Sequence, residues 1–297
     1  MTSSLTQFLA GKSAHDNVIL TENASKRFYI RVEVEKAALA AGMPGHRKDF
    51  MHYLLNSVDS KTGWRPTDEE LKADSLSLIG AGADTIAITI AAFMFYLLRN
   101  PNTLKRATAE VRSVFATASE IRSGPGLDCC AYLQACIEES LRLSPPVASV
   151  LPREVMPGGI TIDGEYIPEG TVVGVPAYVL HHDPEIFPDP WTFRPERWIV
   201  NEDAGVSQTA IKRAHHAMCP FSQGSRGCIG KALAYLELKI ALAHLLFLFD
   251  IRESEGSRLG GGSLHMEEGR EREDEYQLFD CFAAARDGPL VKFRRKM

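Results

Sequence analysis

One long, nearly uncharged segment restricts the folds that this chain can adopt. Asp84 is the only charged residue within residues 75–98. A capping-box sequence at residues 67–70 stands before the segment and Asn100–Pro101 stands after it, so the pattern predicts one helix over residues 66–99. A helix that is apolar on all sides either crosses a membrane or runs through a protein core. Because the charge of Asp84 would lie near the middle of a bilayer, the sequence favours a core helix over a membrane span.

The remaining patterns predict a mainly α fold with a small β part. Further helices are expected from apolar periodicity bounded by Gly, Pro or Asn, over residues 102–118, 132–143 and 230–250. Short β-branched stretches between turn residues predict strands at residues 160–162, 166–167 and 171–176, and a terminal pair formed by residues 276–285 and 290–293. Prolines and aromatic residues at 183–198 predict an ordered coil.

The composition excludes several functional classes. The chain has 297 residues with 33 Lys+Arg against 38 Asp+Glu, and its net charge of −5 argues against general nucleic-acid binding. A hydrophobic content of 45% suits a buried core and rules out a disordered chain. The six cysteines form no Cys-x-x-Cys pair, and residues 1–17 lack the apolar region of a secretory signal. These features predict reduced thiols on the cytosolic side of a membrane.

A glycine-rich loop at residues 221–230 places Cys228 at the start of the apolar helix that follows. Free amide groups and the helix dipole favour an anion at a helix N-terminus, so the sequence predicts a thiolate at Cys228 that can bind a metal. Gly224 and Gly230 permit tight turns and the close approach of a flat ligand. Arg226 can reach an anionic group at the rim of that ligand. For an isolated cysteine, the alternative is a buried, unreactive thiol.

The loop sequence Phe-Ser-Gln-Gly-Ser-Arg-Gly-Cys-Ile-Gly resembles the haem-binding loop of the cytochrome P450 monooxygenases, in their eukaryotic and fungal microsomal type. The resemblance implies the C-terminal portion of the P450 fold, and haem b (iron protoporphyrin IX) as cofactor with Cys228 as the axial ligand of the iron. Arg153 stands where the family commonly contacts a haem propionate, an exposed arginine being the alternative. The implied cofactor-binding residues are Phe221, Gly224, Arg226, Cys228, Gly230 and Arg153.

Two further motifs of the family follow in the expected order. Glu139-Ser-Leu-Arg142 matches its Glu-x-x-Arg helix, and residues 195–198 match its Pro-Glu-Arg-aromatic element. Residues three apart share a helix face, but an exposed ion pair of this kind contributes little stability. The resemblance implies that Glu139, Arg142 and Arg197 instead form a buried structural triad behind the haem and take no part in the chemistry.

The sequence Ala-Gly-Ala-Asp-Thr at residues 81–85 resembles the oxygen-activating segment of the family's central helix. Gly82 would let a ligand approach the backbone, and the hydroxyl of Thr85 beside the carboxylate of Asp84 can open the helix locally and relay protons. The resemblance implies Asp84 and Thr85 as catalytic residues. Ile86 stands where many members have a second Thr or Ser. Without the haem loop, a closely packed helix with Asp84 capped or paired would be the preferred interpretation.

Adjacent histidines occur twice, at His181–His182 and at His215–His216. Neighbouring side chains point in different directions in a helix or a strand. These pairs are therefore predicted to be polar loop residues and not metal ligands.

The resemblance also implies an activity and its partners. A haem-thiolate monooxygenase inserts one oxygen atom from O2 into a lipophilic small molecule, with electrons from NADPH through a separate cytochrome P450 reductase. The chain has no Gly-x-Gly-x-x-Gly nucleotide site of its own. The likeness to fungal members points to secondary-metabolite biosynthesis. The family location is the cytosolic face of the endoplasmic reticulum membrane, and a cytoplasmic location is the alternative because no anchor is recognised.

The resemblance is specific over residues 66–297, so we expect residues 1–297 to form a single partial P450 domain, truncated at the N-terminus. Its parts are the central oxygen-activating helix (66–99), the Glu-x-x-Arg helix (132–143), the haem-binding loop (221–230) and the helix after the ligand (230–250). A non-catalytic remnant is the main alternative to an active enzyme. A haem-thiolate isomerase or dehydratase is a narrower alternative, against which the Asp84–Thr85 pair argues.

Overall fold

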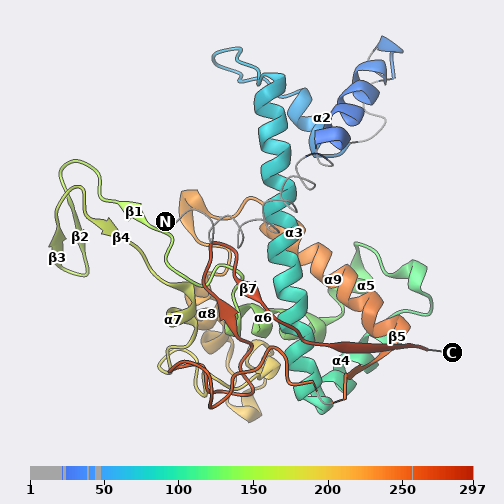
Figure 1. The fold of residues 1–297 in the computed structure, drawn as a ribbon, viewed down its shortest axis with the longest axis vertical. Helices are drawn as coiled ribbons and strands as arrows, with labels where there is room; N and C mark the ends of the chain where they lie inside the picture. Colours follow the sequence, from blue (N-terminus) through green and yellow to red (C-terminus); the bar gives the residue numbers. More distant parts are fainter. Residues whose placement is uncertain (1–21, 23–24, 39, 44–47, 256, 297) are drawn as a thin grey trace, which may run out of the picture. The chain divides into compact units, whose positions relative to one another are not determined.

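A computed structural model describes residues 22, 25–38, 40–43, 48–255 and 257–296. The chain divides into two compact units, residues 1–83 and 84–297. The long helix α3 (Asp68–Arg99) begins in the first unit and continues into the second (Figure 1). The predicted sites at Arg153, at the Glu-x-x-Arg helix and at the Cys228 loop all belong to the second unit.

Helices make up most of the regular structure. The other α-helices with bounds are α2 (Phe50–Leu55), α4 (Pro101–Val114), α5 (Pro125–Asp128), α6 (Ala131–Leu143), α7 (Ala177–His181), α8 (Gln208–Ala217) and α9 (Lys231–Leu248). Short 3-10 helices are η1 (Ala118–Glu120), η2 (Pro195–Trp198), η3 (Glu202–Ala204) and η4 (Gly224–Arg226). The strands are β1 (Arg153–Glu154), β2 (Ile160–Ile162), β3 (Glu165–Ile167), β4 (Val172–Val173), β5 (Phe249–Glu253), β6 (Leu278–Phe279), β7 (Ala285–Arg286) and β8 (Val291–Arg295).

The first unit has a small apolar core. Helical residues 25–38 contribute Phe28 and Val32, and the first turn of α3 contributes Leu71. Partly buried side chains of α2 pack against these three residues. Burying one apolar side chain of this size stabilises the folded state by about 1.5–3 kcal/mol. A core of three such residues therefore contributes little free energy to the described part of this unit.

The helix α3 occupies almost the residues that the sequence predicts for it. Thr67 and Glu70 form the capping box: the Glu70 amide donates to Thr67 Oγ1 at 3.2 Å, and the Thr67 amide donates to Glu70 Oε2 at 2.8 Å. At the other end, Pro101 begins α4 directly after Asn100. The predicted start and stop signals are confirmed.

The burial of α3 differs along its length. Residues 92–97 are all buried in the core of the second unit, whereas residues 77–84 are mostly exposed and belong to neither apolar core. The prediction of a core helix is therefore confirmed for the C-terminal part and wrong for residues 77–84. Among the described residues, α3 is the one helix long and apolar enough to cross a membrane by length and composition.

The core of the second unit lies between α3, α4, α6 and α9. The helix α4 packs against both α6 and α9, and α6 also packs against α9. The carboxylate of Glu110 on α4 accepts hydrogen bonds from the first amides of α6, Tyr132 N and Leu133 N, both at 2.8 Å. Because these amides have no partner within their own helix, Glu110 fixes where the Glu-x-x-Arg helix begins.

The strands described form antiparallel pairs: β1 with β4, β2 with β3, β5 with β8 and β6 with β7. The strands predicted at residues 160–162 and 166–167 are confirmed, and a two-residue turn joins them. Asp163 and Gly164 have φ angles of 50° and 86°, the left-handed values that a two-residue hairpin turn needs.

The predicted C-terminal pairing is wrong. The last strand, β8, pairs with β5, which starts where α9 ends at Leu248, two residues before the predicted end at Asp250. Phe249 and Phe293 contact each other edge to face across this pair, with ring centroids 5.6 Å apart. Residues 276–285 instead contribute β6, whose partner β7 lies close in sequence.

Candidate functional site

The loop that carries Cys228, residues 218–230, connects α8 to α9 and is called the cysteine loop below. Hydrogen bonds between its own residues make it compact. Ser222 and Gly224 have φ angles of 57° and 71°, so the backbone reverses direction within a few residues. The Cys228 amide donates to Phe221 O at 2.8 Å, and the Gly227 amide donates to Gly224 O at 3.0 Å. Cys228 is exposed and lies just before α9 begins.

Gly224 and Gly230, both predicted to allow tight turns, differ in backbone conformation. Gly224 has a left-handed φ, which a residue with a Cβ adopts at a cost. Gly230 is the N-cap of α9 with φ −82°, and a Cβ there would lie 3.7 Å from the Cys228 sulfur, an ordinary contact distance. The left-handed turn therefore favours glycine at 224 but not at 230, and the close approach of a ligand at Gly230 stays a prediction.

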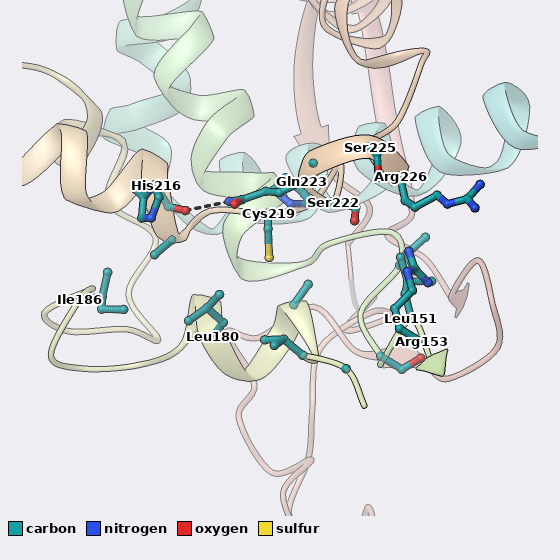
Figure 2. A pocket seen from close by; sticks show the side chains of 18 residues that line it. Leu151, Arg153, Leu180, Ile186, His216, Cys219, Ser222, Gln223, Ser225 and Arg226 are labelled. Carbon is teal, nitrogen blue, oxygen red and sulfur yellow. Dashed lines mark hydrogen bonds between the residues drawn. The ribbon is translucent and has the colours of Figure 1, made fainter. Parts of the chain in front are cut away.

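A cavity of about 890 Å³ lies against the loop. Residues 216–217 at the end of α8 and loop residues 219–220 and 222–226 line it, together with residues from the segments 147–153 and 174–186 (Figure 2). Its apolar lining side chains include Val147, Leu151, Val175, Ala177, Leu180 and Ile186. Figure 2 shows the Cys219 sulfur pointing from the loop toward the space above Leu180. A cavity of this size accommodates a drug-sized or larger ligand.

Two arginines bring positive charge to this apolar cavity. Arg153 on β1 and Arg226 on η4 both line it, and both side chains lie on the same side in Figure 2. Both residues are exposed, and the Arg153 guanidinium donates to Pro152 O at 2.9 Å. The sequence predicts both as partners of an anionic group. Apolar walls with two guanidinium groups on one side suit an apolar ligand with carboxylates at one edge.

Other predicted site residues do not line the cavity. They are Asp84, Thr85, Phe221, Cys228 and Gly230. The Phe221 ring packs instead on Tyr235 of α9, with centroids 5.1 Å apart. Asp84 is exposed and Thr85 is half-buried on α3. The helix α3 continues through both residues, so the structure does not show the local opening predicted at Thr85.

The structure brings Glu139, Arg142 and Arg197 together in a buried cluster. The Glu139 carboxylate accepts from Arg142 Nε at 3.0 Å, from a second Arg142 nitrogen at 2.9 Å, and from Arg197 Nε at 2.8 Å. Glu139 and Arg142 are fully buried and Arg197 is 6% exposed. Burial alone would raise the pKa of Glu139, but the two guanidinium groups outweigh it, so the pKa lies below its usual value.

This cluster also holds the coil that was predicted at residues 183–198. Arg142 donates to Pro190 O at 2.8 Å, and Arg197 donates to Pro188 O at 3.1 Å. Trp198 Nε1 donates to Glu139 Oε2 at 2.8 Å, a contact that the sequence analysis did not anticipate. The carbonyl groups of Pro188 and Pro190, which lack strand partners, are thus satisfied by buried guanidinium groups, and this helps to order the coil.

The prediction that His181 and His182 are polar loop residues is wrong. His181 ends α7 with no exposed surface, and His182, directly after it, is 7% exposed. Burial lowers the pKa of His181 to about 3 and that of His182 to about 4, so both rings are neutral near neutral pH. The partners of His181 lie 38 and 39 residues away in sequence, and no local spacing could have revealed them.

For the second histidine pair, the predicted solvent exposure is confirmed but the predicted loop is wrong. His215 and His216 are exposed in the last turn of α8, a helix and not a loop. The His216 carbonyl accepts from Gln223 Nε2 at 2.8 Å, which ties the cysteine loop to α8. In the part of the chain that the structure describes, no group of three or more His, Cys, Asp or Glu side chains could hold a metal ion.

Comparisons with known proteins agree with these features. The family model described as cytochrome P450 matches residues 7–259. A cytochrome P450 monooxygenase of Gibberella zeae is 45% identical over 255 residues, which cover 85% of this chain and 57% of that protein. Cytochrome P450 monooxygenase fscF of Fusarium equiseti is 40% identical over 293 residues, which cover 97% of this chain and 53% of that protein. The chain thus spans about half the length of the curated relatives it matches.

Solved structures give the same result for the fold. The retinoic acid bound cyanobacterial CYP120A1 superposes with a TM-score of 0.69 at 25% identity, over 96% of this chain and 57% of that one. The haem domain of cytochrome P450DA reaches the same TM-score at 21% identity, which speaks for the fold alone. The mainly α architecture with a small β part is therefore that of known P450 structures. With the family model covering most of its residues, this chain belongs to the cytochrome P450 family.

Proposed function

We propose that this chain is part of a haem-thiolate monooxygenase that inserts one oxygen atom from O2 into a lipophilic small molecule. The observation that carries the proposal is the cavity beside the Cys228 loop, which has apolar walls and is lined by Arg153 and Arg226. A flat, apolar macrocycle with carboxylates at one edge is complementary to such walls. Haem b has this chemistry, so the apolar walls and the two arginines fit the cofactor that the family implies.

The proposal gives each residue of the loop a role. Cys228 supplies the sulfur ligand, Arg153 and Arg226 pair with the carboxylates, and Gly224 allows the turn that shapes the loop. Phe221 and Gly230 lie on either side of Cys228 in sequence: Phe221 packs on Tyr235 of α9, and Gly230 is the N-cap of that helix. When bound, thiolate-ligated haem supplies an electron-rich iron that favours cleavage of the O–O bond. The Glu139–Arg142–Arg197 cluster keeps α6 and the following coil together and takes no part in the chemistry.

Asp84 and Thr85 are the proposed proton-transfer residues. Thr85 Oγ1 can donate and accept a proton, and the adjacent carboxylate of Asp84 is exposed, so it can exchange protons with solvent. The Ile at position 86 leaves this pair unchanged.

The partners follow from the same proposal. Electrons come from NADPH through a cytochrome P450 reductase, and nucleic acid is not a partner. The fungal origin of the relatives supports a role in secondary-metabolite biosynthesis. The proposed location is the cytosolic face of the endoplasmic reticulum membrane.

A carbon monoxide difference spectrum of the reduced chain, reconstituted with haem, tests the ligand. We expect a band at about 450 nm, the sign of thiolate ligation. Cys228→Ala should abolish the band, whereas Cys219→Ala, at the cysteine that lines the cavity beside the loop, should keep it. A band that survives Cys228→Ala would refute the ligand assignment. A wild-type chain that takes up no haem would favour a non-catalytic remnant over the enzyme.

A second experiment tests the proton-transfer pair. Thr85→Ala should increase NADPH consumption relative to product, and Thr85→Ser, which restores a hydroxyl, should recover much of the coupling. Unchanged coupling in Thr85→Ala would remove Thr85 from the proposal. Turnover without O2 or reductase would favour an isomerase or dehydratase.

A further inference from the structure

His181 joins three parts of the second unit that lie far apart in sequence. Its ring is fully buried at the end of α7. Nδ1 lies 3.1 Å from Arg142 O, at the end of α6, and Nε2 lies 2.9 Å from the Cys219 amide, at the start of the cysteine loop. A backbone carbonyl can only accept and a backbone amide can only donate, so Nδ1 carries the proton and Nε2 accepts.

The link between His181 and Arg142 runs in both directions. The Arg142 guanidinium donates to His181 O at 2.9 Å, while the His181 ring donates to Arg142 O. Arg142 is itself fixed by the buried carboxylate of Glu139. The position of the imidazole is therefore determined by the buried ion cluster, and little rotation of the ring is possible without breaking a buried hydrogen bond.

The cysteine loop needs such an attachment because burial does not hold it. Residues 223–229 are all exposed, so apolar packing contributes little to their position. Gln223 bonds to His216 of α8, and Phe221 packs on α9. The bond from Cys219 to His181 is the attachment that leads back to the ion cluster on α6.

We propose that His181 is a positioning residue: it fixes the start of the cysteine loop to the Glu139–Arg142–Arg197 cluster and so sets where the loop presents its sulfur ligand. The role of the loop as a ligand loop rests on the function proposed above. The attachment itself does not depend on that function, because it can be measured without a cofactor.

The first test uses the unchanged chain without haem. Amide hydrogen exchange, resolved to single residues, should show the Cys219 amide protected to a degree similar to that of amides within α6. The exposed loop residues Gln223 and Ser225 should exchange much faster. If the Cys219 amide exchanges as fast as these two residues, the proposal is overturned, whatever any variant does.

The second test compares two adjacent buried histidines. His181→Phe keeps a ring of similar size and removes both hydrogen bonds, so exchange at Cys219 should accelerate about tenfold, as expected for the loss of a buried hydrogen bond. His182→Gln is the matched control. His182 Nδ1 bonds to Tyr178 O at 2.7 Å, and its Nε2 has no hydrogen-bond partner among the described residues. This control should leave exchange at Cys219 unchanged.

His181→Gln supplies a partial rescue, because its side-chain oxygen can still accept from the Cys219 amide. Exchange at Cys219 in this variant should lie between those of the wild type and His181→Phe. Equal exchange in His181→Phe and His182→Gln would overturn the proposal. If His181→Phe does not fold, the comparison of His181→Gln with His182→Gln tests the proposal instead. Only His181→Gln should accelerate amide exchange at Cys219.

A third readout connects the attachment to the cofactor. In samples matched for haem content, His181→Phe should lower the share of the carbon monoxide complex with the thiolate-type band at about 450 nm, and His182→Gln should not. A merely structural role would lower haem content without changing this share. If the wild type binds haem in the thiolate form and His181→Phe has the same share, the inference fails while the proposed function stands. If the wild type shows no thiolate band, the proposed function fails, and exchange at Cys219 still decides the attachment.

Discussion

Replacing Glu139 with Gln should destabilise the chain far more than the same replacement at its neighbour Glu138. Glu139 is fully buried and accepts hydrogen bonds from Arg142 and Arg197 at 2.8–3.0 Å. A neutral amide would leave two buried guanidinium groups without a carboxylate. Breaking a buried ion pair from one side costs about 3–5 kcal/mol. We therefore expect a loss of at least about 3 kcal/mol, a large part of the roughly 5–15 kcal/mol that stabilises a folded domain.

Glu138 is the matched control because it is buried on the same helix in a different electrostatic setting. It is 8% exposed, and its carboxylate accepts from Tyr235 Oη at 2.9 Å and from Gln134 Nε2 at 2.7 Å. Burial raises its pKa, and the hydrogen bonds from Tyr235 and Gln134 offset this only in part. A Gln oxygen can still accept from Tyr235, so Glu138→Gln should cost less than about 1 kcal/mol.

The pH dependence of the two variants should differ in sign. The pKa of Glu139 lies below its usual value of 4.5, so its contribution to stability is present above that value and is lost as the pH falls through the folded-state pKa. Glu139→Gln should remove this part of the acid sensitivity. The pKa of Glu138 is raised above 4.5, so its contribution is present at lower pH and is lost as the pH rises through the folded-state pKa.

Guanidinium unfolding followed by far-ultraviolet circular dichroism measures both variants without using Trp198, whose indole contacts Glu139. The reasoning predicts a much lower midpoint for Glu139→Gln and a nearly unchanged one for Glu138→Gln. Equal shifts, or a loss below about 1 kcal/mol for Glu139→Gln, would mean that the buried cluster is not held by its charge.

Three further outcomes are expected. Arg226→Ala should speed the transfer of haem to an acceptor protein about tenfold, because a charge-assisted hydrogen bond contributes about 1.5–3 kcal/mol; an unchanged rate would exclude Arg226 as a carboxylate partner. Gly174→Ala should lower stability by about 1–3 kcal/mol in thermal melts, because the added Cβ would meet the Val150 side chain and lie 3.0 Å from Leu151 O. Burial lowers the pKa of His181 to about 3 and that of His182 to about 4, from 6.5. As the pH falls, these histidines are therefore protonated in the unfolded chain at a higher pH than in the folded chain. The free energy of unfolding should therefore fall as the pH decreases from about 6.5 toward about 4, and His181→Gln should flatten that slope in a pH series of melts.

The features that could be predicted from the sequence are local. The helix α3 carries its own start and stop signals at Thr67, Glu70 and Pro101, and the β2–β3 hairpin carries its turn at residues 163–164. The family motif of the cysteine loop is also contiguous, and it led to the family that the comparisons show.

The features that could not be predicted depend on contacts between distant residues. The sequence predicts polar loop residues at His181 and His182, yet both side chains are buried in the second unit at the end of α7. The strand β8 pairs with β5, more than 35 residues earlier in sequence, and Phe249 contacts Phe293 across this pair. Residues 77–84 have the composition of a core helix, but burial depends on what packs against them, and they belong to neither apolar core.

The buried polar groups of the second unit explain why an exposed loop can still hold a defined position. Glu139 fixes Arg142, Arg142 and His181 bond to each other in both directions, and His181 accepts from Cys219. Glu139, Arg142 and His181 are fully buried, so leaving any one of these side chains unpaired costs more than an exposed bond of the same kind would contribute. Apolar burial cannot supply this order, because it is non-directional and the loop buries little surface. The position of the cysteine loop is therefore set by directional hydrogen bonds that begin at the ion cluster. A substitution in that cluster should perturb the backbone at Cys219 before it perturbs the packing of the apolar core.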